Sequence, residues 1–554
     1  MNKIIQPFRA LSRSFSQPSR SYFRALSPLF AFSRSLFALF AFAFLIRLAG
    51  LNKGIWLDES SSIELINQPH FLTALRHYDH PPLYFILLKI SSLVSQSEPW
   101  LRLLSVFSSV GVVIMLFLWL KPYHFQGALL AALLAATMPV MLEYAHEIRN
   151  YALLLLTTTS AFYFAPSPQP SPKGRGSQVD SLLPLGEGLG VRGLALSLTV
   201  ATHLVGVMVL PTIIVFMGMS FALAQQWPSP KLVGQTLAAC AVATSLFLYL
   251  YFIFLPPELQ ARSSATWWMP SASLPQVLVT LKYLFGLPTL LGSNSLTTAI
   301  ATPMGLGVTI LALLFMLPML MGDWRMSLPF LAAALTYWFC LWLISTLTAP
   351  IFIARTALPG MIPMLAFIGL QIATIPRPRL KVWSMIAVII LSSYSTFLWV
   401  TQTAWQPIER WQPIAQALQR EWRKDDLVIF YPGYIEGPTR YYWSSNPPFI
   451  PPDSGGTEGG KADSGGTEGG IPPESIVTIW IGGDLSKLGQ TREQVNLIEA
   501  RHFTSAVFLV WRDDQNIAHE PEVYAELQQI LTAKFGSPQE LAHVGNLYVL
   551  KYAR

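Results

Sequence analysis

Charged side chains are scarce in this chain. Asp, Glu, Lys and Arg make up 12% of its 554 residues, whereas soluble domains carry about a quarter. Hydrophobic residues make up 52% of it, and the mean hydropathy is +0.44. This composition predicts one large membrane-embedded domain with an appendage and excludes a row of ordinary soluble domains.

Cysteine is almost absent too. Cys240 and Cys340 are the only two, and each lies inside an apolar stretch. Two cysteines so placed exclude a disulfide framework and a cysteine zinc site, and we interpret them as packed or lipid-facing residues. The net charge of +7 comes from short basic clusters between apolar runs. Such clusters are typical of the cytoplasmic loops of membrane proteins and do not form a nucleic-acid-binding stripe.

Acidic residues are missing from the first 57 positions, which hold eight basic residues. This leader resembles a transit peptide, but it continues into an apolar segment at 28–50 and shows no small-residue cleavage site. We therefore predict a retained first helix with a cytoplasmic N-terminus. Arg47 lies close enough to the end of that helix to reach the headgroup level.

Further apolar runs are long enough to cross a bilayer. They occupy 101–120, 125–142, 204–225, 232–254, 296–321, 327–347, 356–375 and 382–402, and two shorter runs at 150–165 and 194–203 complete the set. Basic and acidic loops alternate between these runs, which predicts about eleven crossings and places the C-terminal region outside the cytoplasm. The predicted location is the plasma or inner membrane.

Two low-complexity segments interrupt the chain. Residues 166–193 are rich in Pro and Gly, and residues 453–470 contain DSGGTEGG twice. Both are interpreted as loop insertions without regular structure. Beyond residue 402 the composition changes, and strands are predicted at 426–431, 476–481, 506–511 and 547–552, with helices at 493–502 and 522–535. The predicted fold is a polytopic all-α membrane domain (1–402) followed by a soluble α/β domain (403–554).

The first acidic loop contains the most informative residues. Asp58 and Glu59 directly follow the first helix, and Asp79 and His80 precede a Pro-Pro pair. A carboxylate at the membrane surface suits deprotonation of a hydroxyl group, and these oxygens could also hold a divalent cation. The alternative is a solvated loop. The segment after the prolines is too short to span, so we expect an interfacial helix with Lys89 at headgroup level.

Three more polar positions lie between apolar runs. The segment 143–151 contains Glu147, Arg149 and Tyr151, and the guanidinium of Arg149 suits a phosphate. A structural Glu147–Arg149 contact is the alternative. His203 is either a ligand contact or a packed or capping residue. Arg355 is either a phosphate contact or an interfacial anchor.

Together these segments resemble the GT-C superfamily of membrane glycosyltransferases, in particular glycosyltransferase family 39, the protein O-mannosyltransferases and the lipid A aminoarabinose transferase. An acidic motif after the first helix and a His-Pro-Pro-Leu-Tyr segment recur in those families, and 58–59 and 79–84 match both. Residues 147–151 resemble a Glu-x-Arg-x-Tyr motif. Thr202-His203 and Arg355 resemble two further elements, with Leu204 and Thr356 where an aromatic residue is usual.

The resemblance implies a polyprenyl-phosphate sugar donor, a lipid, glycan or protein acceptor, transfer on the outer face and inversion at the anomeric carbon. It implies that Asp58 is the base or a metal-site carboxylate, that Glu59, Asp79 and His80 shape the site, and that Arg149 and Arg355 hold the lipid phosphate. Two other interpretations stay open: a transporter or lipid flippase, and a scaffold that binds polyprenyl lipid without catalysis.

Overall fold

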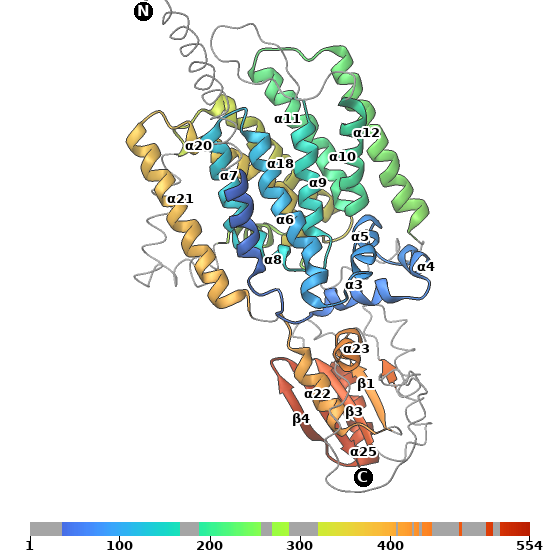
Figure 1. The fold of residues 1–554 in the computed structure, drawn as a ribbon. Helices are drawn as coiled ribbons and strands as arrows, with labels where there is room; N and C mark the ends of the chain where they lie inside the picture. Colours follow the sequence, from blue (N-terminus) through green and yellow to red (C-terminus); the bar gives the residue numbers. More distant parts are fainter. Residues whose placement is uncertain are drawn as a thin grey trace, which may run out of the picture.

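The protein is built mainly of helices that run side by side (Figure 1). The computed structural model describes residues 36–166, 188–255, 269–286, 319–405, 408–423, 426–431, 435–445, 476–478, 506–512 and 521–553. Within these ranges six helical stretches are long and apolar enough to cross a membrane, and the protein is therefore a multi-pass membrane protein. They are α6 (Glu98–Leu120), η1 with α11 (Leu204–Leu223), α12 with η2 (Pro230–Phe254), α18 (Trp324–Leu347), α19 with α20 (Ala354–Ala373) and α21 with η5 (Pro378–Thr403).

Shorter apolar helices match other predicted runs. They are Leu36–Leu48, α5 (Leu83–Ser92), α9 (Tyr151–Phe164) and α10 (Gly188–Thr202). Most of the run at 296–321 lies outside the described residues, so the count of eleven crossings stays a prediction. One expectation was wrong: α10 begins at Gly188, inside the Pro/Gly-rich insert that was expected to lack regular structure. Arg192 in this first part donates to the carbonyl of Phe164 at 3.1 Å.

The predicted run at 125–142 is a broken helix. Helices α7 (Phe125–Thr137) and α8 (Pro139–Ala145) meet at 59°, because a proline cannot donate the hydrogen bond that continues a helix. Arg47 is fully buried at this break and donates to the carbonyls of Ala135 at 3.1 Å and Ala136 at 3.2 Å. The expectation that Arg47 reaches the headgroups was wrong, because the free carbonyls at the end of α7 bind its guanidinium inside the protein.

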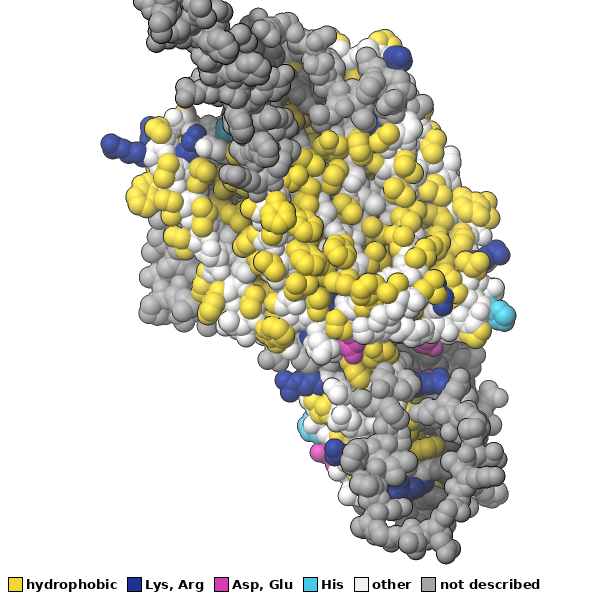
Figure 2. Space-filling model, viewed as in Figure 1, with side chains coloured by type: hydrophobic (Ala, Val, Ile, Leu, Met, Phe, Trp, Pro, Cys, Tyr) yellow, Lys and Arg dark blue, Asp and Glu magenta, His cyan; other side chains and the backbone are white. Residues whose placement is uncertain are grey.

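Hydrophobic side chains cover the helical part, as expected for a surface in contact with lipid (Figure 2). They include Phe107, Phe252, Trp383 and Phe397, each more than half exposed. Ionisable side chains gather near the two ends of the helices instead (Figure 2). This distribution is the one that a bilayer requires.

Three short helices close one end of the helical part (Figure 1). They are α3 (Leu57–Asn67), α4 (Phe71–Arg76) and α5. A five-stranded sheet lies beyond them in the order β2-β1-β3-β5-β4, with strands β1 (Leu427–Tyr431), β2 (Ile476–Thr478), β3 (Ala506–Arg512), β4 (Gln539–Val544) and β5 (Leu547–Ala553). Strands β1, β2 and β3 are parallel, and β5 is antiparallel to both β3 and β4.

The four predicted strands are therefore present, as is the predicted helix at 522–535, which is α25 (Pro521–Phe535). Strand β4 and the helices α22 (Trp411–Glu421) and α23 (Glu436–Ser445) were not predicted. The helix predicted at 493–502 lies outside the described residues, as does the repeat at 453–470.

Alternation along the strands gives the sheet two apolar faces. One face, with Leu427 and Ile429, packs against α25. The other face, with Val428 and Phe430, packs against α22 and belongs to the same apolar cluster as Ile63 of α3. Because one core joins the sheet to α3, the C-terminal region is packed directly against the helix that carries Asp58.

Candidate active site

Asp58 lies in the first turn of α3 between two arginines. Its Oδ2 atom is 2.6 Å from Nη1 of Arg355 and 3.8 Å from Nη2 of Arg149. The Arg149 side chain is 7% exposed, that of Arg355 17% and that of Asp58 24%. Two guanidinium groups thus face one carboxylate, which leaves a positive charge in a partly desolvated place.

Arg149 is held by two neighbours from the loop after α4. It donates to the hydroxyl oxygen of Tyr78 at 3.0 Å and to Nε2 of His80 at 2.6 Å. Burial lowers the pKa of His80 well below its usual value, and the charges of Arg149 and Arg355 act in the same direction. The imidazole is therefore neutral and accepts the hydrogen bond. Burial likewise raises the pKa of Tyr78, to about 12.

Aromatic rings complete this group. The ring of Tyr151 lies 6.0 Å from the guanidinium carbon of Arg149 and 5.9 Å from that of Arg355, within cation–π range. The ring of His203 lies 5.2 Å from that of His80 and 5.9 Å from that of Tyr151. His203 also caps η1, since its Nδ1 accepts from the Val205 amide at 3.2 Å, so it both caps and packs against the site.

Glu59 is engaged elsewhere, although it follows Asp58 directly. It is completely buried, and it accepts from Arg102 Nη2 at 2.7 Å and Nε at 3.0 Å. Its Oε1 also accepts from the backbone amide of Ile148 at 2.9 Å. Its acceptor capacity is thus used to join α3, α6 and the loop before Arg149.

Three further predicted residues do not contact Asp58. We call the residues around it (Asp58, Tyr78, His80, Arg149, Tyr151, His203 and Arg355) the Asp58 group. Asp79 has a side chain that is 58% exposed and lies 3.8 Å from His80. Lys89 donates to the Ile66 carbonyl at 2.5 Å, close to the end of α3. Glu147 is buried with an Oε2 atom that has no hydrogen-bond partner, and burial raises its pKa well above the usual value.

A metal site does not fit the residues around Asp58. Among the described residues no group of three or more His, Cys, Asp or Glu side chains is arranged to hold a metal ion. A cation at the Asp58 carboxylate would also face the guanidinium groups of Arg149 and Arg355, and like charges at this range repel. We therefore derive no step through a metal.

Several residues next to the site were missed by the sequence reasoning. Arg102 pairs with Glu59 and lies 3.6 Å from Glu98 one turn earlier. Tyr442 and Glu409 reach this region from the C-terminal part, where Tyr442 donates to Glu98 at 3.2 Å. Of these residues, the sequence could have indicated only Arg102. A single arginine in an otherwise apolar run costs free energy in a membrane, so its presence indicates a buried acidic partner.

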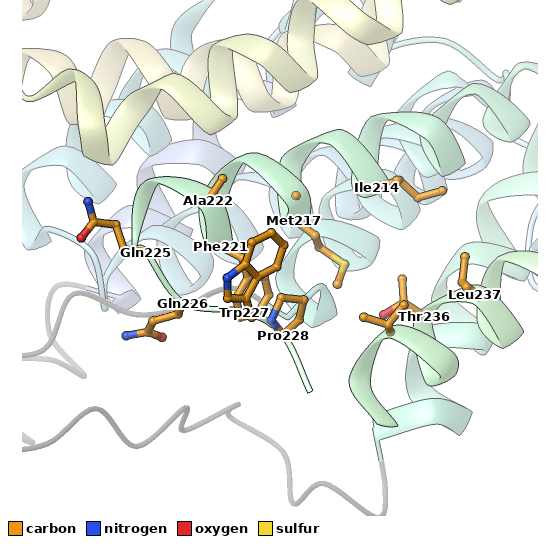
Figure 3. A pocket seen from close by; sticks show the side chains of 12 residues that line it. Ile214, Met217, Phe221, Ala222, Gln225, Gln226, Trp227, Pro228, Thr236 and Leu237 are labelled. Carbon is orange, nitrogen blue, oxygen red and sulfur yellow. The ribbon is translucent and has the colours of Figure 1, made fainter. Parts of the chain in front are cut away.

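A separate apolar cavity of about 680 Å³ lies between α11 and α12 (Figure 3). Met217 and Phe221 line it, and Trp227 and Gln226 lie at the connection between the two helices. This connection is at the end of the helical part opposite to α3 (Figure 1). The cavity is therefore not part of the Asp58 group.

Comparison with known proteins gives matches in structure only. No protein-family model matches the sequence, and no curated protein matches it. The protein ArnT from Cupriavidus metallidurans is similar in its apo state (TM-score 0.52, 10% identity, 95% of this chain and 98% of that chain). The same protein bound to undecaprenyl phosphate is also similar (TM-score 0.50, 10% identity, 96% and 98%).

The archaeal oligosaccharyltransferase AglB from Archaeoglobus fulgidus, in complex with an inhibitory peptide and a dolichol phosphate, is similar as well (TM-score 0.50, 12% identity, 93% of this chain and 74% of that chain). At such identities the likeness concerns the fold. The resemblance that the motifs predict is confirmed at this level: the chain has the fold that ArnT and AglB share.

Proposed function

We propose that the protein is an integral membrane glycosyltransferase that transfers a sugar from a polyprenyl-phosphate donor to a hydroxyl group of a lipid, glycan or protein acceptor. The observation that carries the proposal is the position of Asp58 between Arg149 and Arg355. The similar structures support the donor class, since ArnT is bound to undecaprenyl phosphate and AglB is in complex with a dolichol phosphate.

The two arginines suit the charge that develops in such a reaction. The donor is a phosphodiester with one negative charge, and the released polyprenyl phosphate is a monoester with a charge of about −1.5 to −2. Guanidinium groups already in place at the leaving phosphate stabilise this increase in the transition state. Tyr78 and His80 hold Arg149 in position because each accepts a hydrogen bond from its guanidinium group.

Asp58 is the proposed base. The acceptor oxygen forms a bond to the anomeric carbon while the bond from that carbon to the phosphate oxygen breaks, and the acceptor proton passes to the Asp58 carboxylate. A single displacement of this kind inverts the anomeric centre. In the structure the Asp58 carboxylate holds the guanidinium of Arg355, so an incoming phosphate competes for that arginine and frees the carboxylate to act as base.

The reaction is proposed to take place on the outer face of the plasma or inner membrane, with the C-terminal sheet on the same side. Lys231, Arg325 and Arg379 lie in the first turns of α12, α18 and α21, and Arg377 directly precedes α21. These helices begin at the end of the helical part opposite to α3 (Figure 1). Basic residues mark the cytoplasmic ends of membrane helices. The N-terminus is then cytoplasmic.

The test is turnover of radiolabelled polyprenyl-phosphate sugars by the purified protein, with Asp58→Asn measured beside the wild type. We expect release of polyprenyl phosphate, and a rate about 10²–10⁴-fold lower in the variant, the usual contribution of a general base. Glu64→Gln is the matched control, because Glu64 is an exposed carboxylate on the same helix. Wild-type turnover by Asp58→Asn would remove Asp58 as the base, and a failure to bind any polyprenyl lipid would favour a transporter.

A further inference from the structure

A carboxylate from the C-terminal region lies at the start of the helix that carries Asp58. Oε2 of Glu409 accepts from the backbone amide of Leu57 at 3.0 Å and from the indole Nε1 of Trp411 at 2.7 Å. Its other oxygen, Oε1, is 2.7 Å from Nη1 of Arg512 at the end of β3. Three elements of the protein therefore meet at one side chain that is 12% exposed.

The amide of Leu57 is one of the first amides of α3, which have no partner within the helix. A carboxylate at this place satisfies the amide and interacts favourably with the positive end of the helix. Leu57 is the residue directly before Asp58, so the bond to Glu409 determines where the Asp58 backbone lies. A sequence separation of 352 residues lies between donor and acceptor.

A second contact ties the same loop to the C-terminal region. The Ile55 amide donates to the hydroxyl group of Tyr442 at 2.5 Å, and that hydroxyl donates to Glu98 at 3.2 Å. Ile55 and Tyr442 both belong to the apolar core between α3 and the sheet. The loop before Asp58 is thus held by backbone hydrogen bonds to side chains of the C-terminal region as well as by packing.

We propose that Glu409 is a positioning residue for Asp58: by accepting from the Leu57 amide it fixes the first turn of α3, and with it the base, against the arginine pair. The proposal rests on the function proposed above. It assigns a role in the reaction to the C-terminal region, whose side chains hold the Asp58 loop through Glu409 and Tyr442.

Three substitutions separate this role from that of a stabilising ion pair. Glu409→Gln keeps an oxygen that accepts from Leu57 but loses the charge opposite Arg512. Glu409→Asp keeps the charge but withdraws the carboxylate from α3 by one methylene, and Glu409→Ala removes both. We expect kcat at saturating donor to follow the order wild type, Gln, Asp, Ala, with a loss of up to about a hundredfold for Ala, as for a catalytic group displaced by about 1 Å.

The affinity for the donor is expected to change little, because Arg149 and Arg355 remain in place. Glu421→Ala is the matched control, since Glu421 lies on α22 and pairs with Lys551 at 2.8 Å. We expect wild-type kcat for it. Rates are normalised to the protein that binds donor, so that a lower yield of folded protein is not mistaken for a lower kcat.

Hydrogen exchange of the segment 55–60 provides a readout that does not depend on turnover. Faster exchange in Glu409→Asp than in Glu409→Gln supports the contact even if no donor is turned over, and absent turnover by the wild type then counts against the proposed function alone. The proposal is overturned if Asp retains more activity and protection than Gln, which is the order that an ion pair with Arg512 predicts. The comparison of Gln with Asp decides the matter even if Glu409→Ala fails to fold.

Discussion

Glu59 and Asp58 are adjacent, yet their mutations should affect different properties. Loss of the Glu59 charge should lower the stability of the fold, and loss of the Asp58 charge should lower the rate of transfer. Glu59→Gln removes the charge that faces Arg102, whose side chain is completely buried beside it. The amide that replaces it keeps one oxygen, which accepts from Nε of Arg102 and from the Ile148 amide, but it presents an N–H group to Nη2 of Arg102, from which the carboxylate accepted. One buried cation is left without its main partner.

Breaking a buried ion pair on one side costs about 3–5 kcal/mol. The lower end applies, because Glu98 stays 3.6 Å from Arg102 and compensates part of the charge. At about 2 °C per kcal/mol, the value for larger domains, a loss of about 3 kcal/mol lowers the melting temperature by about 6 °C.

The assay is thermal unfolding of the purified protein in detergent. Glu64→Gln is the control that we expect to melt within about 1 °C of wild type, because Glu64 is exposed on the same helix and surface substitutions usually change stability little. In the double variant Glu59→Gln/Arg102→Met the buried cation is gone, and part of the lost stability should return. An unchanged melting temperature for Glu59→Gln would refute the assignment of Glu59 to a structural ion pair.

Two more predictions concern the arginine pair and its histidine neighbour. Arg355→Ala should weaken donor binding about 10- to 100-fold, since a hydrogen bond to a charged group contributes about 1.5–3 kcal/mol. Equilibrium binding of labelled donor measures this change, and the exposed Arg325→Ala is the control. An unchanged affinity would leave Arg355 as an interfacial anchor. The pKa of His80 is lowered in the folded protein, so below its usual value of about 6.5 the unfolded state binds the extra proton and stability falls as pH falls. Melting temperatures between pH 7.5 and 5 should show this decline, and His80→Gln should reduce its slope; equal slopes would contradict the prediction.

The membrane helices, the β1, β3 and β5 strands and the location of Asp58 and Arg355 at the same membrane face were accessible from the sequence. Hydrophobic runs predict helices because a bilayer allows little else. Alternating loops place 58 and 355 on one side, although 297 residues separate them. The pairing itself was not predicted, because side-chain geometry at a common membrane face does not follow from topology.

Other features depend on tertiary packing that no local pattern carries. Glu59 follows Asp58 and has the same chemistry, and only the position of Arg102 one helix away separates their roles. Arg47 was expected near the headgroups because the break between α7 and α8, which gives it buried carbonyls, was not foreseen. Strand β4 is mostly exposed and lacks a continuous apolar pattern, so it gave no signal.

The order of the strands has a consequence for biosynthesis. Strand β5 lies inside the sheet between β3 and β4, although it is the last strand along the chain. Strand β3, which holds Arg512 against Glu409, therefore lacks a neighbour on one side until β5 has been translated. The membrane helices can insert well before that moment, but the first turn of α3 gains its partner only afterwards. We therefore expect chains that end before β5 to reach the membrane yet stay inactive, so that translation of β5 precedes activity.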